Sequence, residues 1–335
     1  MRPLLATLLL SLSAHLHADD AAVRFAAAAA AKVRDTPSVR GDDPAWFFPT
    51  REVKHLAAGR FWERPWEEVA ANKADPIAGI VEFNELLKQR GIRLLVVPVP
   101  AKASIYPETL VEGFGPGEVA ALAPLLQRAA DAGVEVLDLE PVFLASRRTE
   151  PEKLLYCRQD AHFSPEGAEL VAASIAVAAT FAGVLKNGDL ATGEVESLTL
   201  VGDQIVSSEW EGKVPPETLP VRYVSMGGTV GVSPDEKSPI LLLGDSHTLV
   251  FHEGKASGMH CRGAGVLDHL AARYEIAPDL VGVRGSGLVQ ARKQLFYKAS
   301  AAPGYWDGKR LVVWLFSARE FTQSKDRPVP IPLAR

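Results

Sequence analysis

The chain has 335 residues, enough for one large or two medium domains. Its composition, with 47% hydrophobic and 23% charged residues, excludes a disordered chain and a bundle of membrane helices. A net charge of -5 and the lack of any lysine- and arginine-rich run exclude a non-specific grip on nucleic acid.

The first 18 residues are typical of a secretory signal peptide. Arg2 supplies the positive start, residues 4–14 form a short apolar core, and Ala18 precedes two acids. The core is too short to span a bilayer comfortably, so we expect cleavage near Ala18 and export to the periplasm. Leu16, at the third position before the cleavage site, suits signal peptidase less well than alanine would. An uncleaved inner-membrane anchor is therefore the alternative.

The next part of the chain alternates between helix and strand. Within the lead-in, residues 19–39, the alanine run favours a helix, and residues 40–62 are aromatic and irregular. Two pairs of a helix and a buried strand follow, which is typical of a parallel sheet covered on both faces. The helices are predicted at residues 77–90 and 117–132, and the strands at residues 93–100 and 134–139.

A third helix is predicted over residues 163–183, with Ser164 as its cap and Pro165 in its first turn. Residues 184–239 change character and predict a small β-rich insertion with one or two hairpins. Buried-strand patterns then return in "PILLLGDS", "PDLVGVRG" and "RLVVWLF", with helical stretches near residues 265–274 and 288–299. Five such strands predict a doubly wound, mostly parallel α/β domain over residues 40–325, followed by a tail, residues 326–335.

The stretch "LLLGDSHTLVF" places Ser246 where a buried strand opens into a tight turn. Glycine, aspartate and serine are ordinary turn residues, so the serine could be structural. It could also be a nucleophile, because open parallel sheets bind their ligands at the carboxyl ends of strands. The second interpretation needs a base and an orienting acid.

"YCRQDAHFSPEG" offers that pair in Asp160 and His162. In an extended segment the side chains at i and i+2 point to the same side. The aspartate can then fix the imidazole tautomer while the other ring nitrogen takes the serine proton. His247 is the immediate neighbour of Ser246, which makes a good hydrogen bond awkward, and we interpret it as a bystander.

Two other kinds of site are weighed against this one. An α/β-hydrolase would show Gly-x-Ser-x-Gly with its acid and histidine after the serine, and the order here is reversed. A metal-dependent hydrolase is a weak alternative, since His247, His252 and His260, with Asp245 and Asp268 near, match no metal motif. No metal or other cofactor is predicted.

Four stretches in this order carry a resemblance: "VVPVPAKASIYPETL", "YCRQDAHFSPEGAELVA", "LLLGDSHTLVF" and "RLVVWLFSAREF". Together they resemble the SGNH-hydrolase-like domain of the alginate O-acetyltransferase family (AlgJ/AlgX-like proteins). The resemblance implies an SGNH-hydrolase-like fold with Ser246 as nucleophile, His162 as base and Asp160 as orienting acid. Phe163 stands where the family usually has tryptophan, and Cys157 where an aromatic residue is common.

Several residues around these motifs have open roles. Lys102, Tyr106, Arg284 and Arg319 follow predicted strands and are expected near the active rim. Either arginine could face a developing oxyanion or a sugar carboxylate, or form a surface ion pair. Backbone N–H groups around Ser246 are the safer oxyanion donors. The only two cysteines, Cys157 and Cys261, could form a disulfide in an exported protein or stay free.

The main hypothesis is an exported O-acetyltransferase that moves acetyl through a serine acyl-enzyme to hydroxyls of an exopolysaccharide such as alginate. The resemblance implies a membrane-bound O-acyltransferase as the acetyl donor. A carbohydrate acetylesterase would use the same site, with water as acceptor. A non-catalytic sugar-binding component of an export complex is the third reading. The sequence does not identify the polymer, separate transfer from hydrolysis or give the oligomeric state.

Overall fold

A computed structural model describes residues 21–180, 190–206 and 208–334. The predicted signal peptide, residues 1–18, lies outside the described residues. Within them, none of the helices combines the length and the apolar character that crossing a bilayer requires.

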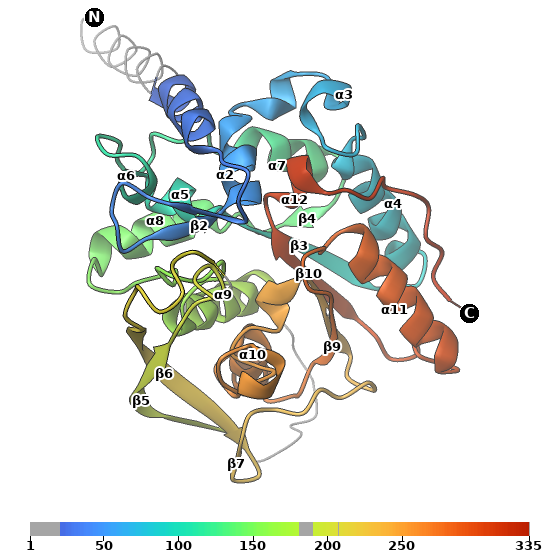
Figure 1. Ribbon diagram of the computed structural model, residues 1–335. Helices are drawn as coiled ribbons and strands as arrows, with labels where there is room; N and C mark the ends of the chain where they lie inside the picture. Colours follow the sequence, from blue (N-terminus) through green and yellow to red (C-terminus); the bar gives the residue numbers. More distant parts are fainter. Residues whose placement is uncertain (1–20, 181–189, 207, 335) are drawn as a thin grey trace, which may run out of the picture.

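The centre of the protein is a five-stranded sheet in the order β4-β3-β10-β8-β9 (Figure 1). All of its neighbouring strands are parallel, as the repeated pairs of helix and buried strand predict. The strands are β3 (Arg93–Val99), β4 (Glu135–Val136), β8 (Ile240–Gly244), β9 (Asp279–Gly282) and β10 (Leu311–Ser317).

Two hydrophobic cores lie on opposite faces of this sheet. Alternate residues of β10 show the division, with Leu311, Val313 and Leu315 in one core and Val312 and Trp314 in the other. The first core contains α9 (Pro165–Ala178) and α10 (Val266–Tyr274). The second contains α4 (Pro76–Lys88), α7 (Ala123–Asp131) and α11 (Val289–Ala301). Covered faces explain why the strands read as continuous apolar runs.

The helix boundaries follow local chemistry. The Ser164 side chain accepts the N–H of Gly167 at 3.0 Å, which confirms the predicted cap of α9. Helix α7 begins six residues later than predicted, at Ala123, and β4 has only two residues. Gly117 has a positive φ of 86° and keeps the preceding segment in a turn, and Pro124 suits the first helical turn.

The predicted β-rich insertion is an antiparallel sheet of β5 (Leu190–Leu200), β6 (Glu217–Met226) and β7 (Thr229–Val230). Strands β6 and β7 join through Gly227 and Gly228, which both have positive φ. The sheet packs against α9 and α10, beside the first core (Figure 1).

Residues 40–62 are more regular than predicted. The region contains β2 (Phe47–Pro49), α2 (Thr50–Ala57) and the 3-10 helix η1 (Phe61–Glu63), and β1 (Ser38–Arg40) pairs with β2. Helix α2 contacts α12 (Glu320–Gln323), which follows β10, so it lies at the carboxyl end of the sheet. Residues 21–32 are helical, as the alanine run predicts. Further helices in the described residues are α3 (Trp66–Val69), α5 (Lys102–Ile105), α6 (Pro107–Leu110), α8 (Glu140–Thr149), η2 (Ser246–Thr248) and η3 (Lys255–Ser257).

A buried lysine joins three of these segments. Lys102 begins α5 and is 0% exposed. Its Nζ donates to the carbonyl oxygens of Phe47 (2.5 Å), Cys157 (3.0 Å) and Asp160 (2.9 Å), and its backbone N–H donates to the Glu52 carboxylate at 2.9 Å. The ammonium group thus fixes β2 and the loop before His162 against α5.

We predict that Lys102→Met lowers the free energy of unfolding by about 3 kcal/mol, because buried carbonyl oxygens lose their donor while the side chain keeps its length. Urea denaturation measures the change. Lys88→Met is the matched control, since Lys88 is exposed and pairs only with Glu85 on α4. Its effect should stay within about 0.5 kcal/mol. Equal stability of the two variants would contradict the role given to Lys102.

Candidate active site

Ser246 lies at the carboxyl end of β8, on the short helix η2. A Cβ atom at Gly244 would overlap the carbonyl oxygen of Leu315 on β10, so the strand end requires glycine. Asp245 then ties the turn to β10, because its Oδ2 accepts the N–H of Ser317 at 2.8 Å. The turn is therefore rigid, and Ser246 is 8% exposed.

Asp160 and His162 contact each other as predicted, but through a different backbone shape. The Oδ1 atom of Asp160 accepts the Nδ1–H of His162 at 2.5 Å and the backbone N–H of the same residue at 3.1 Å. Residues 158–162 form a bend rather than an extended segment. The two side chains meet because the aspartate closes a turn on its own backbone, as Asp commonly does.

The electrostatics of the pair suit a general base. Burial would raise the pKa of Asp160, but the charges and hydrogen bonds of His162 and His260 outweigh it and hold that pKa well below its usual range. Burial would lower the pKa of His162, but the Asp160 carboxylate outweighs this and raises it. The ionised aspartate can only accept, so Nδ1 of His162 carries a proton and Nε2 is the nitrogen that can take one.

Ser246, His162 and Asp160 all line one pocket of about 660 Å³. No hydrogen bond joins the Ser246 hydroxyl to His162 in the described structure, and the contact of nucleophile and base stays a prediction. Such contacts are often long in unliganded enzymes. The N–H of Ser246 opens η2, and the first N–H groups of a helix have no partner within it, which suits an oxyanion donor.

His247 forms a second aspartate–histidine pair beside the first. Its Nδ1 lies 3.0 Å from Asp245 Oδ1, and its ring packs edge-on against His162 with centroids 4.9 Å apart. Burial lowers the pKa of His247 below its usual value. His247 does not line the pocket, and its ring packs behind His162. This position agrees with its interpretation as a bystander.

The two predicted arginines both line the pocket, but in different states. Arg319 follows β10 and is only 7% exposed, and its guanidinium makes no hydrogen bond or ion pair with the described residues. The Arg284 side chain is 52% exposed and donates to Glu253 Oε2 (3.1 Å) and to the Ser257 carbonyl oxygen. Arg284 therefore forms a surface ion pair at the pocket edge. Arg319 makes no direct contact with a carboxylate among the described residues, although its charge helps to lower the pKa of the buried Asp245.

The expectation that Lys102 and Tyr106 lie on the active rim is wrong. Lys102 is enclosed by backbone carbonyl groups. The Tyr106 hydroxyl is buried, where it accepts the N–H of Leu155 at 3.0 Å, and its ring packs against Trp46. Lys102 begins α5 and Tyr106 lies between α5 and α6, and the side chains of both residues point inward rather than along the rim.

The loosely grouped histidines do not form a metal cluster either. His252 pairs with Asp268 at 3.0 Å, and His260 pairs with Asp160 at 2.8 Å. His247 pairs with Asp245, so His247, His252 and His260 each contact a different carboxylate. The ligand atoms of Asp160, His162 and Asp203 lie within 4.8 Å of one another. Both oxygens of Asp160 already accept N–H groups, so a metal there would have to displace them.

The cysteines are free. Cys157 is buried with its Sγ 3.6 Å from the carbonyl oxygen of Phe163, and Cys261 is half-buried. The disulfide that the sequence left open is therefore absent from the structure.

Several residues that complete the pocket were not predicted from the sequence. Helix α2 and the segment before it contribute basic side chains, and the insertion contributes Asp203, whose backbone N–H donates to Asp160 Oδ2 at 2.8 Å. Gly202 lets this loop approach, because a Cβ there would overlap the backbone of Gln159. No local motif signals such long-range contacts. The missed lining residues include Arg34, Arg51, Lys54, Asp203, Gln204 and His260.

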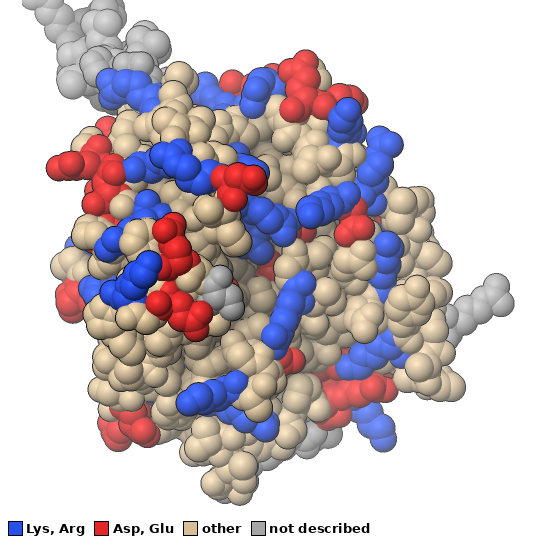
Figure 2. Space-filling model, viewed as in Figure 1, with Lys and Arg blue, Asp and Glu red and all other residues tan. Residues whose placement is uncertain are grey.

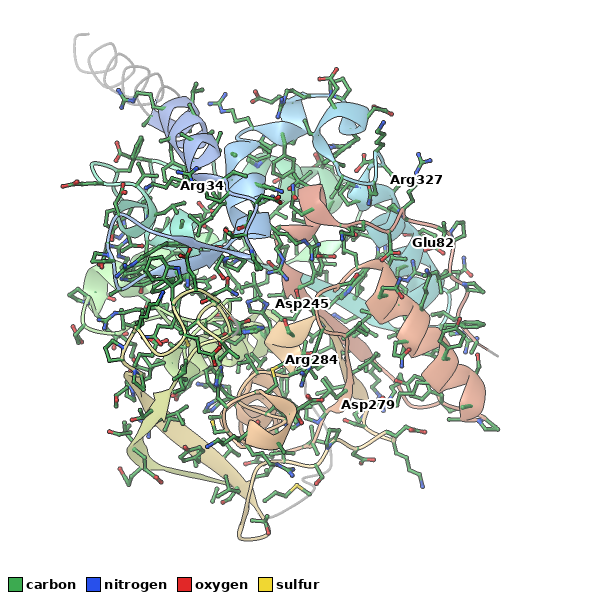
Figure 3. All side chains as sticks on the ribbon, in the orientation of Figure 1. Arg34, Glu82, Asp245, Asp279, Arg284 and Arg327 are labelled. Atoms are coloured by element: carbon green, nitrogen blue, oxygen red, sulfur yellow. The ribbon has the colours of Figure 1, made fainter. Side chains whose placement is uncertain are left out.

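The pocket has a positively charged rim. Arg34, Arg51, Lys54, Arg284 and Arg319 line it, and blue side chains gather around the hollow near the centre of Figure 2. Figure 3 shows Arg34 and Arg284 on either side of Asp245, which marks the end of β8. The lining also contains the carboxylates of Asp35, Asp160 and Asp203, so its five basic side chains outnumber its three acidic ones.

Comparisons with known proteins agree with this architecture. The chain is 32% identical over 142 residues to the probable alginate O-acetylase AlgJ of Pseudomonas aeruginosa, which covers 41% of the chain and 32% of the relative. The AlgJ of Azotobacter vinelandii is 31% identical over 146 residues, with 42% and 33% covered. The chain thus matches about a third of the length of these curated relatives.

Two solved structures share the fold. The O-acetyltransferase domain of Pseudomonas putida AlgJ has a TM-score of 0.62 at 22% identity and covers 86% of this chain and 93% of that one. Pseudomonas aeruginosa AlgX has a TM-score of 0.56 at 20% identity, with 84% and 61% covered. The family model described as "SGNH hydrolase-like domain, acetyltransferase AlgX" matches residues 39–253. Because that match extends over more than half of the chain, the protein belongs to this AlgX family of SGNH hydrolase-like domains.

Proposed function

We propose that the protein is an exported O-acetyltransferase that acetylates hydroxyls of an anionic exopolysaccharide through Ser246. The single observation that carries the proposal is the shared pocket of Ser246 and the Asp160–His162 pair at the carboxyl end of the sheet. Its family, and relatives named as alginate O-acetylases, support the choice of acetyl chemistry.

The proposed reaction has two acyl-transfer steps. The Ser246 hydroxyl attacks the acetyl carbonyl carbon as His162 Nε2 takes its proton, and the Ser246 N–H stabilises the oxyanion. Collapse breaks the bond to the donor's leaving group, which receives the proton from His162. A sugar hydroxyl then attacks the acetyl-serine, loses its proton to His162 and leaves as the acetyl ester, while Ser246 recovers its proton.

The acetyl donor and acceptor come from outside the chain. Acetyl-CoA is a cytoplasmic metabolite, so an exported enzyme needs another source, and a membrane-bound O-acyltransferase is the donor that we propose. The acceptor is inferred from Arg319, a buried guanidinium without a partner among the described residues, facing the pocket. The Asp245 carboxylate offsets part of this charge without a direct hydrogen bond, so the guanidinium N–H groups stay available, and the carboxylate of a uronic acid in a polymer such as alginate suits them.

The first test is covalent. With an acetyl ester as donor, intact-mass and peptide analysis should find acetyl on Ser246, and Ser246→Ala should abolish it, since no other hydroxyl has the His162 base. His247→Ala should retain most of the activity, because that ring is held on Asp245 as a wall. An adduct on another residue, or full activity in Ser246→Ala, would leave the serine as a turn residue.

The second test is the pH dependence. His162 must be neutral to act as base, and its pKa is raised by Asp160, so kcat/KM should fall as the pH falls through that raised value. Asp160→Asn removes the charge, which should move this acid limb to lower pH and lower the plateau on the order of a thousandfold. Asp131→Asn, on the exposed face of α7, is the control. An unmoved limb in Asp160→Asn would contradict the assignment of His162 as base.

The third test concerns the acceptor. Arg319→Leu should lower kcat/KM for an oligouronate about tenfold or more, because one charge-assisted hydrogen bond is lost. Activity toward a small neutral acetyl ester should change far less. Arg284→Gln is the matched control and should have a smaller effect, since Arg284 is already paired with Glu253. Acetyl on the oligosaccharide indicates transfer, and free acetate alone would indicate an esterase. Equal losses in transfer to the oligouronate and in turnover of the neutral acetyl ester would exclude a carboxylate role for Arg319.

A further inference from the structure

The Asp160 carboxylate is held by two imidazole rings. Its Oδ1 atom accepts from His162 at 2.5 Å, and its Oδ2 atom lies 2.8 Å from Nε2 of His260. Because the carboxylate is ionised, the second contact is also an N–H donated to the aspartate. The Oδ2 atom of Asp160 also accepts the backbone N–H of Asp203 at 2.8 Å.

His260 belongs to a different part of the chain from the pair that it supports. It follows η3, in the loop that leads away from Ser246, and it lines the same pocket. The contact therefore links the loop after the nucleophile with the loop that carries Asp160 and His162, one hundred positions apart in sequence.

The backbone at His260 is in the left-handed region, with φ of 62°. Glycine is the default residue for this conformation, and a side chain there carries a strain cost. Phe251 is also left-handed, with φ of 59°, and the two rings pack with centroids 5.6 Å apart. A ring-bearing residue thus stands where glycine would fit the backbone, and within the described residues the hydrogen bond of its side chain is with Asp160.

We propose that His260 is a positioning residue for the acylation chemistry, which holds Asp160 by its second oxygen and so sets the orientation and basicity of His162. The inference rests on the proposed function of Ser246. Without the His260 donor, Asp160 keeps its full negative charge for His162 and gains freedom to rotate. The imidazole then holds its proton more tightly and is less well aimed at the serine.

Other charged and titratable groups face this network and stay the same in the test. Asp203, Asp245 and His247 face the His162 ring, and Lys102, Asp203 and Glu217 lie around Asp160. A substitution at position 260 leaves all of these groups in place. A change in the pKa of His162 therefore reports the loss of the His260 contact.

The experiment compares His260→Phe, which keeps a ring against Phe251 but has no donor, with His260→Gln, which keeps an N–H at similar reach. The readouts are the NMR titration of the His162 ring in the unreacted protein, assigned by its loss in His162→Gln, and kcat and KM for acetyl-ester turnover. In His260→Phe the pKa of His162 should rise by about half a unit to one unit. The kcat should fall about tenfold, with KM within about twofold. His260→Gln should restore most of both.

Unchanged titration and kcat in His260→Phe, or equal losses in the two variants, would overturn the role. If His260→Phe does not fold by circular dichroism, His260→Asn replaces it, since its shorter side chain does not reach Asp160 and the same contrast with His260→Gln applies. The titration needs no substrate. A wild-type protein without acetyl on Ser246 would therefore refute the proposed function, while the His162 shift would still decide whether His260 acts on the pair.

Discussion

The buried ammonium group of Lys102 is the contact on which the site depends. Four carbonyl oxygens surround it, three from the loop of residues 157–160 and one from β2. Burial lowers the pKa of this lysine, while carboxylates such as Glu52 oppose the shift. A loop without regular hydrogen bonding thus acquires one fixed shape, with the Asp160 side chain directed at the pocket.

Two aspartate–histidine pairs, Asp160–His162 and Asp245–His247, lie side by side next to the pocket, and their surroundings give them different properties. His162 faces the pocket and has a raised pKa, because Asp160 is close and ionised. His247 has the same kind of partner but a lowered pKa, since burial outweighs Asp245 and the charges of His162 and Arg319 oppose its protonation. Residue type alone therefore does not mark the base. Access to the pocket, together with the balance of burial and charge, distinguishes one imidazole from the next.

Apolar runs were enough to predict the five parallel strands, because both sheet faces are buried and each strand is continuous in sequence. The contact of Asp160 with His162 was also predictable, since it spans two residues, although the backbone bends rather than extends. Lys102 was misplaced because a strand-end position does not reveal whether a side chain turns inward. Asp203 was not predicted for the site, and His260 was considered only as a metal ligand, because both reach Asp160 from distant loops that only the assembled fold brings together.

The positive rim of the pocket is assembled from segments far apart in the chain. Arg34 and Arg51 precede the sheet, Arg284 follows β9 and Arg319 follows β10. The unfolded chain has a net charge of -5 and no basic stretch, so it has no cluster of positive charges to which a polyanion could bind. Any affinity of this rim for a polyanion would consequently arise only in the folded chain. Retention on an anionic matrix would then depend on folding, because these basic side chains come together at one pocket only in the folded protein.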